Sequence, residues 1–339
     1  MSLVDRVRVQ ALVAAMEAPD ALARRMVRVP EEIEGQPVDL RTRLFLTFLK
    51  LDHQDPHALS VGAQRALIDL AERTFAPTPE PAERGYVEVP LAGRTLRLRS
   101  TVPPGAGRRG FLYLHGGGFC TGNAEAYDAF CARLARRVGC RVWALDYRLA
   151  PEHPFPAAVD DVVDTWRWLR ANADTLGVDA ASLGVGGDSA GGNLSAVLCN
   201  TLGADELPAV QVLLYPGTDM VHERPSRHTF GQGYYMSNAH VRWFYETYVP
   251  DAALRLDPRA SPIYAARLGH VPAVLALAGL DTLVDEGRAY GARLEAAGVP
   301  VETVFVPGMV HGFVNLFRIL PAAAGAVDAV CAAVERSWR

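Results

Sequence analysis

The chain has 339 residues, 50% of them hydrophobic and 21% charged, and its formal net charge is −4. This composition is typical of a globular protein with a large core, and the lack of a basic excess argues against a nucleic-acid partner. No apolar run reaches the roughly 18 residues of a membrane span, and the first residues lack the pattern of a secretory signal, so we expect a cytoplasmic protein without a membrane span.

Residues 1–80 are predicted to form helices and loops. Apolar residues recur at helical spacing over 7–16, 40–51 and 60–75, and Ser60 is a candidate N-cap. Prolines at 77, 79 and 81 then predict a stiff connector. The segment holds no set of residues that suggests catalysis. We interpret it as a helical cover, part of a cap, or an oligomer surface.

From residue 85 onward, strands and helices alternate. Segments 86–90 and 95–101 are predicted to form an antiparallel pair. Further strands are expected at 111–114, 141–147, 183–186, 210–215, 273–278 and 301–306, with helices at 126–138, 157–176, 190–202, 284–297 and 321–337. This alternation predicts an α/β fold with a mostly parallel central sheet and helices on both faces.

The predicted sheet is interrupted by an insertion at about 218–262 that is rich in Tyr, Trp, Phe and Met. An insertion after the carboxyl end of a strand lies over the crevice where open α/β sheets bind ligands. We therefore interpret it as a cap on a main domain of residues 81–339, with residues 1–80 forming the rest of the cap. The alternative is that its aromatic side chains form a small core of their own.

Five cysteines, Cys120, Cys131, Cys140, Cys199 and Cys331, occur in the chain. Their number is odd, and no Cys-x-x-Cys or Cys/His cluster has the spacing of a metal site. We expect free thiols and no bound metal. A bridge between Cys131 and Cys140 is a less favoured alternative.

The stretch Gly187-Asp188-Ser189-Ala190-Gly191 lies between a predicted strand and a predicted helix. Gly-x-Ser-x-Gly in that context is the pattern of a nucleophile elbow, in which glycines allow a sharp turn that exposes the serine. A five-residue match can arise by chance. The interpretation therefore depends on whether the chain also supplies a base, an acid and oxyanion donors.

Candidate donors lie in His115-Gly116-Gly117-Gly118-Phe119, directly after the strand predicted at 111–114. Consecutive glycines leave backbone N–H groups accessible to a carbonyl oxygen, and this pattern serves as an oxyanion loop in lipases and esterases. The N–H of Ala190 is the expected partner donor. We expect His115 to organise the loop.

The candidate base is His311, beside glycines after the last predicted strand, and the candidate acid is Asp281, after the strand at 273–278. Asp285 and Glu286 begin the next helix, where the helix dipole favours acids, so a structural role suffices for them. Other histidines leave alternatives open, and His222, His228 and His240 in the insertion could line a pocket. The order Ser189, Asp281, His311 is that of the α/β-hydrolases.

These motifs, with the stretches 146–158, 257–262, 281–287 and 311–313, resemble the bacterial hormone-sensitive-lipase-like carboxylesterases over roughly residues 85–335. The resemblance implies the α/β-hydrolase fold, with Ser189 as nucleophile, Asp281 as acid and His311 as base. It assigns oxyanion donors to Gly117, Gly118 and Ala190, and it implies no cofactor. It also favours small esters with short to medium acyl chains and allows a homodimer formed through the edge of the last strand.

Two features depart from the family pattern. Thr282 stands where the family usually has a proline after the acid, which predicts a less stiff loop. Residues 1–80 are also longer than the family's small N-terminal cap, so the resemblance predicts neither the shape of the pocket nor a particular ester within that class.

The sequence thus predicts a serine carboxylesterase that acts on a small-molecule ester through an acyl-enzyme. An amidase, a lactonase or an acyltransferase would use the same three residues and stays an alternative. A catalytically silent ligand receptor on the same fold is disfavoured because all three residues are present. A dinucleotide enzyme is disfavoured because the glycine runs do not fit Gly-x-Gly-x-x-Gly.

Overall fold

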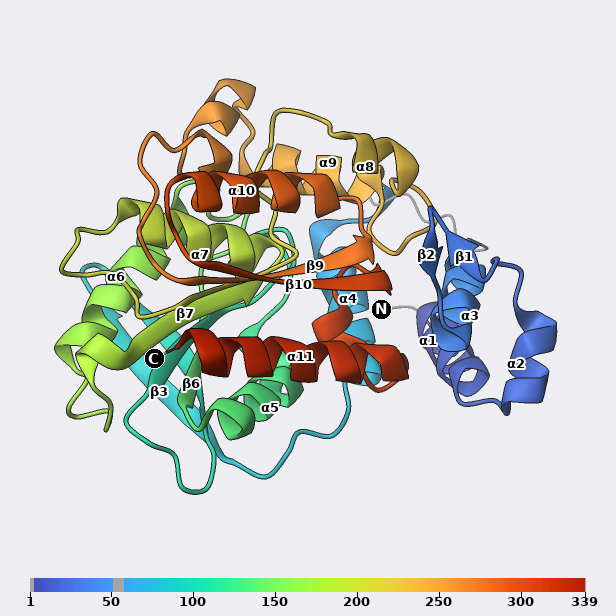
Figure 1. Cartoon of the computed structure of the whole chain (residues 1–339), viewed down its shortest axis with the longest axis horizontal. Coiled ribbons are helices and arrows are strands. Elements are labelled where there is room, and N and C mark those ends of the chain that lie inside the picture. Colours follow the sequence, from blue (N-terminus) through green and yellow to red (C-terminus); the bar gives the residue numbers. More distant parts are fainter. Residues whose placement is uncertain (1–2, 51–57, 339) are drawn as a thin grey trace.

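The computed structural model describes residues 3–50 and 58–338, so the end of the helix predicted at 40–51 lies outside the described residues. Its main sheet has eight strands in the order β10-β9-β8-β7-β5-β6-β4-β3 (Figure 1). The strands are β3 (Glu83–Leu91), β4 (Arg94–Val102), β5 (Gly110–Leu114), β6 (Arg141–Asp146), β7 (Leu183–Asp188), β8 (Gln211–Leu214), β9 (Ala273–Leu280) and β10 (Val301–Val310). Strands β5 to β10 are parallel, whereas β3 and β4 are antiparallel, as predicted.

Helices cover both faces of the sheet. In Figure 1, α6, α7 and α10 lie on one side of the strands, and α5 and α11 lie on the other. These helices are α5 (Asp128–Val138), α6 (Ala157–Ala171), α7 (Ala190–Thr201), α10 (Val284–Ala296) and α11 (Pro321–Ser337). Every residue of β5, β7, β8 and β9 is buried, because a parallel strand between two helical layers has no solvent-facing side. The predicted architecture is confirmed.

The helix predicted at 157–176 is five residues too long. Helix α6 ends at Ala171, and the Asn172 side chain donates from Nδ2 to the Trp168 carbonyl at 2.8 Å. An asparagine that bonds to the backbone in this way favours a turn over further helix. The chain then reverses through Gly177, whose φ is +74°.

The N-terminal segment contains a feature that the sequence did not indicate. Its helices are α1 (Leu3–Met16), α2 (Asp20–Met26), α3 (Leu40–Leu49) and α4 (Val61–Phe75), and Ser60 caps α4 by accepting from the Ala63 N–H at 3.2 Å. Between α2 and α3 lies an antiparallel hairpin of two-residue strands, β1 (Glu32–Ile33) and β2 (Gln36–Pro37). Strands this short have no detectable period. Figure 1 shows the hairpin beside the ends of β9 and β10.

The insertion occupies the connection from β8 to β9 and contains α8 (Pro225–Thr229) and α9 (Asn238–Tyr248). Figure 1 shows both helices at the same end of the sheet as the hairpin. All five cysteines are free and buried, so the Cys131–Cys140 alternative is wrong. Within residues 3–50 and 58–338, no helix combines the length and apolarity that crossing a membrane requires.

A buried carboxylate fixes the chain that follows β6. Asp161 on α6 is fully buried and accepts hydrogen bonds from the backbone N–H of Arg148 at 2.9 Å and from its guanidinium. Arg94 on β4 donates to the same carboxylate from Nε at 2.7 Å. The loop after β6 is therefore anchored to a helix and to a second strand through one side chain.

We expect Asp161→Ala to destabilise the protein by about 3 kcal/mol, because two arginines would lose a buried partner. The free energy of unfolding in urea measures the effect. Asp160→Ala is the matched control, since Asp160 is the exposed neighbour, and it should change stability by no more than about 0.5 kcal/mol. Equal effects of the two substitutions would contradict this account of the loop.

Candidate active site

Ser189 lies on a strained turn between β7 and α7. Its backbone has φ +54° and ψ −113°, a region that residues with a side chain rarely adopt. The Ser189 N–H donates to the Leu214 carbonyl at 2.8 Å. A Cβ on Gly187 or on Gly191 would overlap the carbonyl oxygen of Leu114 at the end of β5. The two glycines therefore let the elbow pack directly against the strand that leads into the glycine loop.

Asp281 and His311 meet because of the strand register. The last paired residues of β9 and β10 are Leu280 and Val310. Asp281 and His311 directly follow them and therefore lie side by side. His311 Nδ1 donates to Asp281 Oδ2 at 2.8 Å, and Asp281 Oδ1 accepts from the Leu283 N–H at 2.9 Å. Both side chains are buried.

The second ring nitrogen of His311, Nε2, is buried and has no hydrogen-bond partner among residues 3–50 and 58–338. Because Nδ1 carries the proton given to Asp281, Nε2 is a free acceptor. The imidazole packs against the Tyr215 ring with centroids 4.7 Å apart and an interplanar angle of 60°, which restricts its rotation. The imidazole is thus oriented on one side and open to a proton on the other.

The glycine loop is attached to the elbow by Asp188, the residue before the serine. Its buried carboxylate accepts from the Gly116 N–H at 2.8 Å and from the hydroxyls of Tyr113 at 2.7 Å and Tyr127 at 3.1 Å. Burial raises the pKa of Asp188 to about 6, although both tyrosine hydrogen bonds act in the opposite direction. The sequence analysis predicted no role for Asp188. Its position directly before Ser189 in the elbow motif was the feature that could have indicated one.

His115 begins the same loop and is held from both sides. Its ring stacks on Tyr147 with centroids 4.3 Å apart, and the Tyr147 hydroxyl donates to the His115 carbonyl at 2.8 Å. Its Nδ1 lies 2.7 Å from the Gly116 carbonyl. These contacts agree with the expectation that His115 organises the loop.

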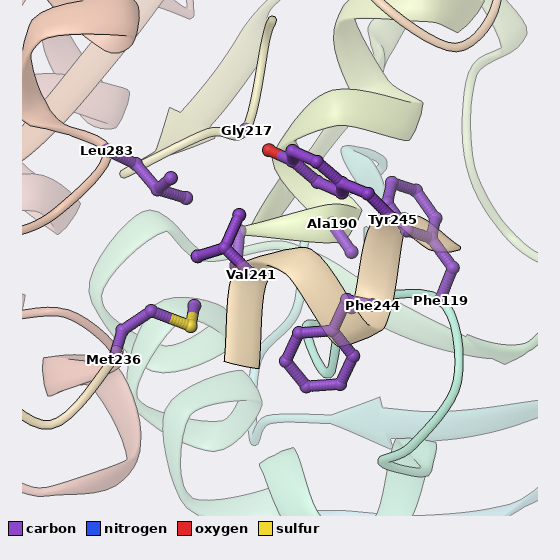
Figure 2. A pocket seen from close by; sticks show the side chains of 10 residues that line it. Phe119, Ala190, Gly217, Met236, Val241, Phe244, Tyr245 and Leu283 are labelled. Atoms are coloured by element: carbon purple, nitrogen blue, oxygen red, sulfur yellow. The ribbon is translucent and has the colours of Figure 1, made fainter. Parts of the chain in front are cut away.

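A mostly apolar pocket opens at the serine (Figure 2). It is lined by Gly118, Phe119, Ser189, Ala190, Gly217, Met236, Val241, Phe244, Tyr245 and Leu283. Two of the predicted donors, Gly118 and Ala190, are in this lining, and within the described chain neither of their N–H groups donates a hydrogen bond. Gly117 lies in the adjoining turn, where its carbonyl accepts from the Cys120 and Thr121 N–H groups.

The insertion supplies one wall of the pocket. Met236, Val241, Phe244 and Tyr245 come from it, and a Cβ on Gly118 would overlap the Phe244 ring. Other aromatics of the insertion pack on one another, such as Phe230 and Tyr234, whose ring centroids are 5.2 Å apart. Some aromatics of the insertion therefore line the pocket, and others form a small core within the insertion. His222, His228 and His240 are not in the lining.

Glu286 on α10 anchors the start of the insertion. Its Oε1 accepts from the Thr218 N–H at 2.7 Å, and its Oε2 is buried without a partner among the described residues. Burial raises the pKa of Glu286 from 4.5 to about 8, because the ionised form loses its hydration. Asp285 likewise accepts from the Ser226 N–H at 2.9 Å, so both acids have the structural role predicted for them. Within the same residues, no group of three or more His, Cys, Asp or Glu could hold a metal ion.

The raised pKa of Glu286 predicts a pH-dependent stability. Between about pH 4.5 and 8 the folded chain holds a proton at Glu286 that the unfolded chain has lost, so this group favours folding below that range and loses its contribution as the pH rises. We expect Glu286→Gln, which mimics the protonated form, to flatten the fall of Tm between pH 5 and pH 9. The exposed Glu246→Gln is the control, and a Glu286→Gln curve parallel to the wild type would contradict the prediction.

The sequence matches the family described as alpha/beta hydrolase fold over residues 111–315. It is 38% identical over 316 residues to the carboxylic ester hydrolase LipN of Mycobacterium tuberculosis, covering 89% of this chain and 84% of that protein. It is 41% identical over 239 residues to the ethyl acetate hydrolase of Pseudomonas putida, covering 68% of this chain and 75% of that protein.

Among solved structures, an ester hydrolase from the metagenome of Lake Arreo, complexed with a bipyridine phosphonate derivative, superposes with a TM-score of 0.83. It is 38% identical, and the match covers 88% of this chain and 98% of that chain. A thermostable esterase from Pseudomonas putida superposes with a TM-score of 0.84 at 28% identity, covering 91% and 99%. The predicted fold and the resemblance to the hormone-sensitive-lipase-like esterases are confirmed, and the chain belongs to the α/β-hydrolase family.

Proposed function

We propose that this chain is a serine carboxylesterase that hydrolyses small esters through an acyl-enzyme intermediate. The observation that carries the proposal is the His311–Asp281 hydrogen bond of 2.8 Å, combined with a pocket that contains Ser189 on a strained turn. The names of the relatives, an ethyl acetate hydrolase and a carboxylic ester hydrolase, support the same reaction class. A cytoplasmic location and a homodimer stay predictions.

In the first step, His311 Nε2 takes the proton of the Ser189 hydroxyl as the serine oxygen attacks the ester carbonyl carbon. Asp281 keeps the imidazole in the tautomer that leaves Nε2 open and stabilises the imidazolium that forms. The same proton then passes to the alkoxy oxygen as the carbon–oxygen bond breaks and the alcohol leaves.

In the second step, water attacks the acyl-enzyme and gives a proton to His311 Nε2. The tetrahedral intermediate collapses, the carboxylic acid leaves, and His311 returns the proton to Ser189. Each tetrahedral intermediate carries an oxyanion, for which we propose the N–H groups of Gly117, Gly118 and Ala190 as donors. Such a donor typically contributes about 3 kcal/mol to transition-state stabilisation.

The pocket lining supports a small apolar acyl or alcohol group. Phe119, Met236, Val241, Phe244 and Leu283 offer only carbon and sulfur to the ligand. Phe244 lies directly over Gly118, so the space beside the oxyanion loop is closed by an aromatic ring. We therefore propose short to medium acyl chains, with the insertion limiting their length.

We also propose that the insertion at 218–262 and residues 1–80 act together as a cap. Phe45 on α3 packs on Tyr235 with ring centroids 5.5 Å apart, and Lys50 Nζ lies 5.3 Å from the centre of the Tyr234 ring. The insertion is also bonded to the loop that follows β9. The Thr282 hydroxyl lies 3.0 Å from the Phe230 carbonyl and 2.7 Å from the Met236 carbonyl, so it can donate to either.

We expect Thr282→Val to loosen the pocket wall, because a methyl group replaces the hydroxyl that holds the Met236 backbone. KM for a p-nitrophenyl ester should rise more than kcat falls, and stability should drop by about 1 kcal/mol. The control is Thr229→Val, since the exposed Thr229 bonds only within α8. An unchanged KM in Thr282→Val would contradict this role.

Ser189→Ala should lower kcat for p-nitrophenyl acetate on the order of 10⁵-fold, because the nucleophile is lost, and His311→Ala should do likewise. Both variants should keep the wild-type circular dichroism spectrum, and Ser182→Ala should stay fully active. A fluorophosphonate should label the wild type at Ser189 and leave Ser189→Ala unlabelled.

An acyl series from acetate to laurate, with matched amide and lactone substrates, distinguishes ester hydrolysis from the other reactions of the same triad. A preference for the amide or the lactone, or activity retained in Ser189→Ala, would refute the proposed function. Absence of labelling in the wild type would instead favour a silent receptor.

A further inference from the structure

One side chain of the N-terminal hairpin reaches the ends of the two strands that precede the acid and the base. The Gln36 amide donates from Nε2 to the Gly279 carbonyl at 3.0 Å, and its Oε1 accepts from the Gly308 N–H at 3.1 Å. Gly279 is two residues before Asp281, and Gly308 is three residues before His311. A single amide thus bridges the ends of β9 and β10 from a position 243 and 272 residues away in the sequence.

The bridge fills a gap in the sheet. Strands β9 and β10 pair regularly up to Ala278 and Val306, and the next pair is Leu280 and Val310, so β10 carries extra residues at this point. A bulge of this kind leaves backbone groups without ladder partners. The Gln36 amide supplies one N–H and one C=O, the same two groups that a peptide unit would contribute to the ladder.

The packing around the bridge excludes side chains at both glycines. A Cβ on Gly279 would overlap Gln36 Oε1, and a Cβ on Gly308, whose φ is +67°, would overlap the Pro37 carbonyl oxygen. The hairpin therefore packs directly against the backbone of both strand ends.

We infer that Gln36 is a positioning residue, which fixes the end of β9 relative to the end of β10 and thereby the alignment of Asp281 with His311. This inference rests on the roles proposed for those two residues. Gln36 itself does not touch the substrate. It acts by restraining the two backbones at the point where their own pairing is interrupted. Small displacements of catalytic groups reduce turnover strongly, because proton transfer requires close alignment.

The first test is Gln36→Met, which keeps the length of the side chain and removes both hydrogen bonds. We expect kcat for p-nitrophenyl acetate to fall by about 10- to 100-fold per active site titrated with a fluorophosphonate, while KM changes little. We expect a strongly deshielded proton resonance for His311 Nδ1 in the wild type, and this resonance should broaden or shift upfield in Gln36→Met. Glu32→Met places the same side chain at an exposed position of the same hairpin and should leave all three measurements unchanged.

A second variant approaches the bridge from the opposite side. Gly279→Ala puts a methyl group where Gln36 Oε1 lies and should reduce kcat in the wild-type background. With Gln36→Ala already present, the same methyl group no longer overlaps the amide and has Pro307 Cα at 3.1 Å as its remaining close neighbour, so it should reduce kcat much less. The two effects should therefore be strongly non-additive, as expected for residues that share one contact.

The outcomes separate the two proposals. If Gln36→Met keeps the wild-type kcat per titrated site and an unchanged Nδ1 proton resonance, the positioning role is refuted. The proposed function is tested separately, and it fails if Ser189→Ala or His311→Ala stays active, whatever Gln36→Met does. A loss confined to Tm, with kcat unchanged, also refutes the role and leaves Gln36 as an anchor of the hairpin. If Gln36→Met does not fold, Gln36→Glu, which keeps an acceptor for Gly308, decides by the same criteria.

Discussion

The pairing of β9 with β10 is the constraint on which the rest of the site depends. It aligns Leu280 with Val310, so the following residues, Asp281 and His311, become neighbours although 30 positions separate them in the chain. Parallel strands end at the same edge of a sheet, and each continues into a loop that is free to carry a functional side chain. The elbow after β7 and the glycine loop after β5 lie at that same edge. The carboxyl edge of the sheet thus supplies the elbow, the glycine loop, the acid and the base, and the insertion adds one wall of the pocket.

Buried acids hold these loops in place. Asp188 accepts hydrogen bonds from the Gly116 N–H and from two tyrosine hydroxyls, and Glu286 accepts one from the Thr218 N–H at the start of the insertion. Burial raises the pKa of both carboxyls, which means that each pays a desolvation cost in its ionised form. In return, each offers strong acceptors to backbone groups that would otherwise lack partners. Such groups fix the geometry of a site more narrowly than apolar packing does, because hydrogen bonds depend on direction.

The segment from Gly279 to Thr282, where β9 ends, is restrained from two sides by parts of the chain that are remote in sequence. Gln36 of the hairpin holds Gly279, and the Thr282 hydroxyl bonds to the insertion at Phe230 or Met236. The family usually has a proline at position 282, and its replacement predicted a looser loop. In the structure, Thr282 restrains the loop in another way, through its hydroxyl, because a proline has no hydroxyl and could not make this contact. The threonine at this position thus adds a hydrogen bond to the insertion.

The sequence by itself determined the features that depend on local patterns. Apolar runs of strand length predicted the parallel sheet, and glycines beside Ser189 predicted a sharp turn, because burial and backbone sterics act on neighbouring residues. The order of Ser189, Asp281 and His311 along the chain is that of the α/β-hydrolases and thereby indicated ester hydrolysis as the reaction class. Only the tertiary structure decided what Gln36 and Asp188 contact and which aromatics of the insertion face the pocket. Those properties follow from the approach of segments up to hundreds of residues apart, and a hairpin of two-residue strands leaves no period by which a sequence could reveal it.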